Sequence, residues 1–91
     1  MTADPPWAIA YSETGRAGLA TATPEERAAV LGFEKQAAAS PYTCGELYPD
    51  RVGGLYTAQL SVGGRYAWTS VLYRVDEVRR EVLIVAIVSG P

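Results

Sequence analysis

The chain has 91 residues, of which 48% are hydrophobic and 20% are charged, which is the balance of one globular domain and not of a disordered segment. A net charge of −2 argues against a strongly basic nucleic-acid binder, and the lack of histidine excludes mechanisms that depend on imidazole. The single cysteine, Cys44, rules out an intrachain disulfide and leaves no ligand set for zinc.

The amino terminus shows no targeting signal. Residues 1–6 contain no basic cluster and no long apolar run, so we expect a loose tail and not a signal peptide. The longest apolar run, residues 82–88, is far too short to span a bilayer. The sequence therefore predicts a single domain over residues 1–91, a cytoplasmic location, and no membrane, metal or cofactor partner.

A short strand is predicted over residues 7–11, because large apolar side chains alternate with alanine there. Residues 12–22 follow with weak helical character, since Gly15 and Gly18 each cost about 1 kcal/mol against alanine in a helix. We expect one or two helical turns in this segment.

The next helix has clear ends in the sequence. Thr23 is expected as the N-cap and Pro24 as the first helical residue, and Glu26 completes a capping box with Thr23. The helix should end at Ser40, because Pro41 disfavours helical geometry in the residue before it.

One face of this helix is suited to packing on a sheet, because Val30, Phe33 and Ala37 fall on a single stripe. Leu31 points away from that stripe. It either packs on the preceding helical turn or is exposed as a contact for a partner protein.

A strand is predicted over residues 55–62, where apolar side chains alternate inward and polar ones, Thr57 and Gln59 among them, alternate outward. The pair Gly63-Gly64 is typical of a tight hairpin turn. The strand after it should start at residue 65.

This third strand, residues 65–75, does not keep one alternation. Trp68 belongs to one face, whereas Val71 and Tyr73 belong to the other. A β-bulge near residues 69–70 would reconcile the two halves.

The strongest local signal is the hairpin at the carboxyl end of the chain. Residues 71–76 form one strand, residues 77–81 a polar turn, and residues 82–88 an unbroken apolar strand. Because every side chain in the last strand is apolar, we expect a central strand that is covered on both faces.

This order of elements, with several short motifs, resembles the RelE/ParE superfamily of toxins from type II toxin–antitoxin systems. The resemblance covers most of the chain from Trp7. It rests on an aromatic-led first strand, a helix that ends before Pro41-Tyr42, a glycine turn after the second strand, the motif V-L-Y-R-V-D at residues 71–76, and the apolar last strand.

The resemblance implies an α+β fold with the order β-α(α)-β-β-β. It implies an antiparallel four-stranded sheet in the order 1-4-3-2, with one or two helices packed on one face. In that arrangement the first strand lies beside the last, which agrees with a central position for residues 82–88.

The resemblance implies chemistry less directly, because a fold does not fix an activity. RelE-like members cleave messenger RNA in the ribosome with lysines and arginines that stabilise charge on phosphate. Where they place lysines, this chain has Thr57 and Gln59, and Ser70 stands at an arginine position, for which Arg65 could substitute in space. The basic, aromatic carboxyl-terminal extension of the family has no counterpart in this sequence.

Three hypotheses follow. The first is a toxin-like protein that binds a macromolecular target, as ParE-like relatives bind gyrase, and that a cognate antitoxin neutralises. The second is a ribosome-dependent mRNA endonuclease with candidate catalytic residues Arg51, Arg65, Arg74 and Tyr73. The third is a degenerate, non-toxic binding domain.

The balance of these observations is against an enzyme. Arg51, Arg65 and Arg74 give residues 51–75 a local charge of +3, which is small beside that of most nucleic-acid binders. For partner binding, Leu31 and Trp68 are the candidate residues, because both are large apolar groups without an evident place in the core.

Overall fold

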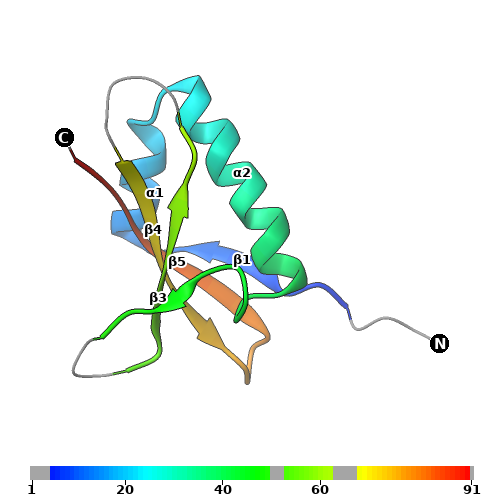
Figure 1. The fold of residues 1–91 in the computed structure, drawn as a ribbon. Coiled ribbons are helices and arrows are strands. Elements are labelled where there is room, and N and C mark those ends of the chain that lie inside the picture. The colour runs from blue at the N-terminus through cyan, green and yellow to red at the C-terminus, as the bar shows by residue number, and fades with distance from the viewer. Residues whose placement is uncertain (1–4, 50–52, 63–67, 91) are drawn as a thin grey trace.

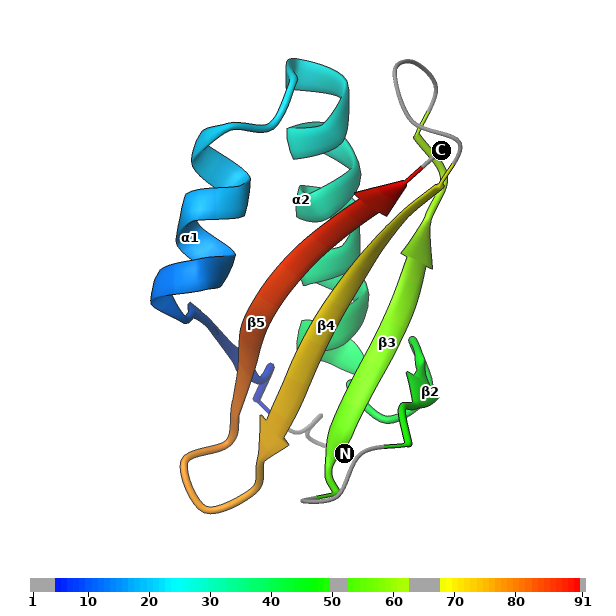
Figure 2. The same ribbon diagram turned by 90° about the vertical axis from the view of Figure 1, so that its left-hand side faces the viewer.

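The computed structural model describes residues 5–49, 53–62 and 68–90. Its elements, in chain order, are β1 (Ala8–Tyr11), α1 (Glu13–Ala20), α2 (Pro24–Ala39), β2 (Glu46–Leu47), β3 (Leu55–Leu60), β4 (Trp68–Asp76) and β5 (Glu81–Gly90) (Figure 1). Both helices pack on one face of a single sheet with the order β1-β5-β4-β3-β2, and no described helix or strand covers the other face, called here the open face (Figure 2). The α+β class, the helices on one face and the place of the first strand beside the last are therefore confirmed.

Two details of the predicted sheet are different. The sheet is mixed and not antiparallel throughout, because β1 runs parallel to β5. The α1–α2 hairpin returns the chain to its starting end, so β3 enters parallel to β1, and two antiparallel steps then make β5 parallel to both. The sheet also gains β2, a strand of two residues whose exposed side chains give no periodic signal.

Helix α1 has eight residues, about the two turns that the sequence predicts, and both of its glycines pack on β5. A Cβ atom on Gly15 would lie 2.4 Å from the Ile84 carbonyl oxygen, and one on Gly18 would lie 3.3 Å from the Ile87 Cβ. Ser12 caps the helix by accepting a hydrogen bond from the Gly15 backbone N–H at 3.0 Å. The close approach of helix and strand thus offsets the low helix propensity of glycine.

Helix α2 begins and ends where the sequence predicts. Thr23 and Glu26 form the reciprocal capping box, with Glu26 N donating to the Thr23 hydroxyl at 3.2 Å and Thr23 N donating to the Glu26 carboxylate at 2.9 Å. The predicted stripe of Val30, Phe33 and Ala37 is buried against the sheet.

The irregularity of the sheet lies in β5 and not near residues 69–70. Leu72 pairs with Ala86 and Tyr73 pairs with Ile84, so Val85 is the extra residue of a β-bulge. The Ser12 hydroxyl donates to the Val85 carbonyl oxygen at 2.8 Å, which satisfies a group that the bulge releases from the ladder.

This bulge also explains the unbroken apolar run. It shifts the alternation by one residue, so that Val82, Ile84 and then Ile87 face the helices. The prediction of a central strand is confirmed, but on its open side only Gly90, under the Trp68 ring, is buried. On that side Val88 is 36% exposed, so cover on both faces was wrong for the described chain.

The predicted glycine turn at residues 63–64 lies outside the described residues, as do Arg51 and Arg65. The alternation predicted for β3 is confirmed, with Ala58 buried in the core and Gln59 exposed.

Candidate functional site

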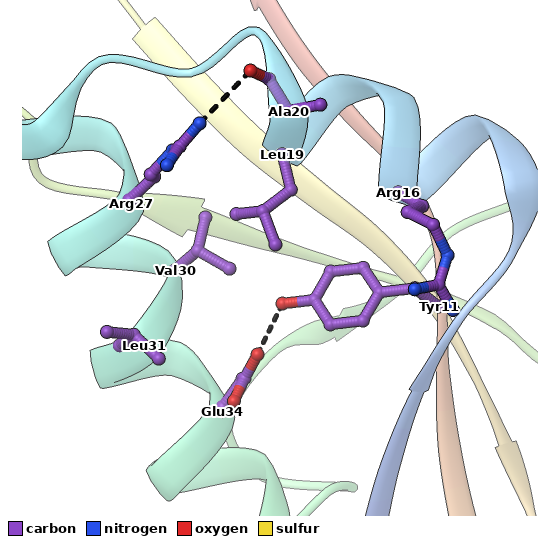
Figure 3. Close-up of a pocket in the computed structure, with 8 residues that line it drawn as sticks. All are labelled: Tyr11, Arg16, Leu19, Ala20, Arg27, Val30, Leu31 and Glu34. Carbon is purple, nitrogen blue, oxygen red and sulfur yellow. Dashed lines mark hydrogen bonds between the residues drawn. The ribbon is translucent and has the colours of Figure 1, made fainter.

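Helices α1 and α2 enclose an open apolar groove on the outer side of the helical layer. Its volume is about 340 Å³. Figure 3 shows the residues that line it, which come from β1, α1 and α2: Tyr11, Arg16, Leu19, Ala20, Arg27, Val30, Leu31 and Glu34. Leu31 forms part of the rim and is 57% exposed, so its side chain is available to a partner.

Charged groups surround this groove without filling its centre. The Tyr11 hydroxyl donates a hydrogen bond to the Glu34 carboxylate, and the Arg27 guanidinium donates to the Ala20 carbonyl oxygen at 3.1 Å. Partial burial, followed by the hydrogen bond and the charge of Glu34, raises the pKa of Tyr11 well above its usual value. The groove therefore combines an apolar floor with two arginines, Arg16 and Arg27, at its rim.

The open face of the sheet carries a second hollow, of about 420 Å³, at the β3 edge. It brings together Thr57, Gln59 and Ser70, the three positions at which the family resemblance implies basic residues. The residues that complete its lining precede or begin β2 or lie in β3: Thr43, Cys44, Gly45, Glu46 and Ala58. Along the described lining there is no arginine or lysine, and Glu46 is its charged residue.

Tyr73, a candidate catalytic residue, lies in the core with 0% of its surface exposed. Its hydroxyl donates to the Pro41 carbonyl oxygen at 2.8 Å and lies 3.3 Å from the Cys44 sulfur. Burial, then the hydrogen bond with Cys44, raises the pKa of Tyr73 far above that of a free tyrosine. Its ring stacks on Tyr56 with centroids 5.5 Å apart, which is the environment of a structural aromatic residue.

Arg74, the next candidate, lies on the open face, because neighbouring residues of a strand alternate. Its guanidinium donates to the Gly53 carbonyl oxygen at 2.8 Å. Tyr73 and Arg74 thus face opposite sides of the sheet and are not brought together. The other two candidates, Arg51 and Arg65, lie outside the described residues.

The two candidate partner-binding residues also occupy different surfaces. Leu31 borders the helical groove, whereas Trp68 is on the open face of the sheet, where it is 41% exposed. The Trp68 ring covers Gly90, since a Cβ atom there would lie 2.4 Å from the indole. One small partner segment cannot contact both residues at once.

The structure shows a cluster of aromatic rings near the amino terminus that the sequence did not predict. The Trp7 ring meets Tyr42 edge-on at 6.0 Å between centroids, and Tyr42 meets Tyr56 at 5.9 Å. Arg80, which the sequence places in a solvated turn, lies 4.7 Å over the Trp7 ring and donates to the Pro5 carbonyl oxygen at 3.0 Å. The cluster ties the β4–β5 turn to the start of the chain.

In the part of the chain that the structure describes, Cys, Asp and Glu side chains nowhere gather into a group that could hold a metal ion. None of the helices in that part has the length and hydropathy needed to cross a membrane.

The sequence matches no protein-family model and no curated protein. Solved structures do match. A chain of the toxin–antitoxin complex RelBE2 from Mycobacterium tuberculosis superposes with a TM-score of 0.75 and 24% identity over 92% of this chain and 91% of its own length.

Two Escherichia coli structures agree with this match. The isolated RelE toxin gives a TM-score of 0.75 at 13% identity, covering 93% of this chain and 85% of its own. The intact RelBE toxin–antitoxin complex gives 0.71 at 12% identity, covering 93% and 96%. The chain therefore has the RelE toxin fold.

Proposed function

We propose that this chain, which has the RelE toxin fold, is the toxin-like component of a type II toxin–antitoxin pair. It acts in the cytoplasm by binding a macromolecular target, and a cognate antitoxin neutralises it. The fold match supports a toxin-like protein. The observation that favours binding over RNA cleavage is the chemistry of the open face, where Thr57, Gln59 and Ser70 converge on one hollow without a described cation.

The electrostatics of this face argue against RNA cleavage. Without histidine or metal, cleavage needs several cations that offset the charge building up on phosphate, and losing one such donor costs about 3–4 kcal/mol. Neutral hydroxyl and amide groups replace these cations in the hollow. Arg74 is the arginine that the structure describes on the open face. It donates a hydrogen bond to the Gly53 carbonyl oxygen, just before the start of β3.

The helical groove supports an antitoxin partner. It offers an apolar floor about Leu19 and Val30, an exposed Leu31 and two arginines at the rim. An amphipathic helix that presents apolar residues to the floor and acidic residues to Arg16 and Arg27 has the complementary pattern. Two of the matched structures are toxin–antitoxin complexes, which supports a partner of this class.

A co-purification experiment tests the partner. The chain is expressed with the product of the adjacent reading frame, and Leu31→Asp is compared with Val78→Asp, which also places a carboxylate at an exposed apolar site but lies in the β4–β5 turn. Leu31→Asp should weaken co-purification and Val78→Asp should not. Equal recovery of the two variants would place the partner on another surface.

A translation assay tests the chemistry. Purified protein is added to programmed ribosomes, and the message is mapped by primer extension. We expect no cleavage in the ribosomal A site. Specific cleavage that is lost in Arg65→Ala or Arg74→Ala would establish the alternative, a ribosome-dependent mRNA endonuclease.

A further inference from the structure

The outer edge of β3 is covered along only part of its length. Strand β2 pairs with β3 at Tyr56 and Thr57, and the backbone N–H of Tyr48 donates to the Leu55 carbonyl oxygen at 2.7 Å. Residues 58–60 pair with β4 on one side, and no described strand lies on their other side. Figure 2 shows β2 beside the lower part of β3 alone.

The direction of the free backbone groups follows from this pairing. Because the Leu55 carbonyl points toward β2, and alternate residues of a strand share a direction, Thr57 and Gln59 also point their N–H and C=O groups outward. Thr57 meets β2. Gln59 lies beyond the end of β2, and no described strand pairs with its outward N–H and C=O groups.

The chain before β2 packs closely on β3 at Thr57 and then turns inward toward Tyr73. A Cβ atom on Gly45 would lie 2.5 Å from the Tyr73 hydroxyl oxygen and 2.6 Å from the Thr57 carbonyl oxygen. Cys44 is directed inward, with its sulfur 3.3 Å from the same hydroxyl. This inward turn leaves the polar hollow of about 420 Å³ beside Gln59.

The charges of the residues that line this hollow indicate which kind of ligand it can bind. Glu46 is exposed at its border, and the rest of the described lining is neutral, with hydroxyl and amide groups from Thr43, Thr57, Gln59 and Ser70. A phosphate group would meet a carboxylate and no described cation, so a nucleic acid is disfavoured. A lysine or arginine side chain would meet a carboxylate and several hydrogen-bond acceptors.

We propose that the free edge of β3 at Gln59 binds an extended segment of a protein partner, which adds a strand to the sheet and places a basic side chain in the hollow against Glu46. This inference rests on the proposed function, because it names the chemical class of the target. Main-chain hydrogen bonds along the edge supply general affinity, and the basic side chain supplies selectivity.

The test uses short synthetic peptides and the full chain labelled with ¹⁵N. The first peptide is acetyl-Thr-Val-Lys-Val-Thr-amide. The second replaces Lys by Glu, and the third is the lysine peptide N-methylated at every residue, so that neither of its edges can donate main-chain hydrogen bonds to the sheet. A ten-nucleotide RNA is the fourth probe. Binding is read from amide chemical shifts of residues 57–61 and of the α1–α2 groove.

The lysine peptide should shift the amides of residues 57–61. The glutamate peptide should bind about two- to fivefold more weakly, as expected for one exposed ion pair, and the N-methylated peptide at least about fivefold more weakly, because it loses the edge hydrogen bonds. Glu46→Lys should give a loss similar to that of the glutamate peptide, whereas Glu25→Lys, an equal charge change on α2, should not. Gln59→Pro removes an outward N–H and should weaken binding, while Gln59→Ala keeps that N–H and should bind.

Equal binding of the lysine and glutamate peptides, or no shifts at residues 57–61 at millimolar peptide, would overturn this inference. Tighter binding of the RNA at the same amides would assign the hollow to nucleic acid instead. Co-purification of the antitoxin, and its loss in Leu31→Asp, tests the α1–α2 groove, which lies on the helical side of the sheet and not at the β3 edge. If the antitoxin is still recovered while no peptide binds, the edge site is wrong and the toxin–antitoxin proposal stands.

Discussion

The contact between α1 and β5 gives the sharpest test of the structure, because two helical glycines should respond oppositely to the same substitution. Gly15 faces the strand, with 2.4 Å between its ideal Cβ position and the Ile84 carbonyl oxygen. Gly32 lies on the exposed side of α2, with nothing within 4 Å of its Cβ position. Replacing glycine by alanine in an open helix position stabilises by about 1 kcal/mol, so Gly32→Ala should be stabilising.

At Gly15 the same gain in helix propensity is present, but the methyl group meets backbone and not a side chain that could rotate away. Helix α1 must then shift from β5. This shift strains the hydrogen bonds from the Ser12 backbone to the Ile84 carbonyl at 2.9 Å and from the Ser12 hydroxyl to the Val85 carbonyl at 2.8 Å. Overpacking of this kind costs about 1–3 kcal/mol and each of the two strained hydrogen bonds about 1 kcal/mol, so after the gain of about 1 kcal/mol in helix propensity the net destabilisation should be about 2–4 kcal/mol.

Urea denaturation followed by far-UV circular dichroism measures both effects. For a domain of this size, 1 kcal/mol corresponds to a change in Tm of about 4–8 °C, so the two variants should separate clearly in thermal scans as well. If Gly15→Ala proves as stable as Gly32→Ala, then α1 does not approach β5 as described, and the argument for its packing is refuted.

Three further predictions concern the core, a cap and pH. Ile84→Ala, at a site with 0% exposure, should lower the free energy of unfolding by about 2–5 kcal/mol in urea titrations, and a loss below 1 kcal/mol would contradict its central position. Thr23→Ala removes the α2 capping box and should cost about 1 kcal/mol, whereas Thr21→Ala, which removes exposed hydroxyl hydrogen bonds to the Ala17 and Gly18 carbonyl oxygens, should cost less. The hydrogen bond to Glu77, followed by desolvation, raises the pKa of Tyr42 from 10.0 to about 12. Because the folded state holds this proton more tightly, the contribution to stability is complete below pH 10 and is lost as the pH rises toward 12. Tyr42→Phe should therefore lessen the fall in stability between pH 10 and 12, and an unchanged pH profile would show that the pair does not form.

The sequence by itself determined the features that depend on neighbours along the chain. The capping box at Thr23 and the proline after Ser40 define α2, because caps and proline act within one turn of the backbone. The alternation of β3 predicts that Ala58 is buried and Gln59 exposed, since side chains of a strand have a period of two. The order of strands came from the family resemblance and agrees with the apolar character of β5.

Tertiary structure decided where those local rules compete with packing. Gly15 and Gly18 weaken a helix in isolation, yet they allow α1 to approach β5 more closely than alanine would. The bulge lies at Val85 and not near residues 69–70, because the Ser12 side chain and α1 meet the strand there. Periodicity along one strand cannot show which of two paired strands carries an extra residue.

The candidate sites, too, depend partly on local sequence and partly on tertiary structure. Side-chain chemistry alone showed that Thr57, Gln59 and Ser70 are neutral at positions that the resemblance expects to be basic. Their convergence with Glu46 in one hollow, the separation of Leu31 from Trp68 and the burial of Tyr73 depend on contacts between residues far apart in the chain. Local sequence cannot specify these contacts, because they form only when sheet pairing and helix packing bring distant segments together.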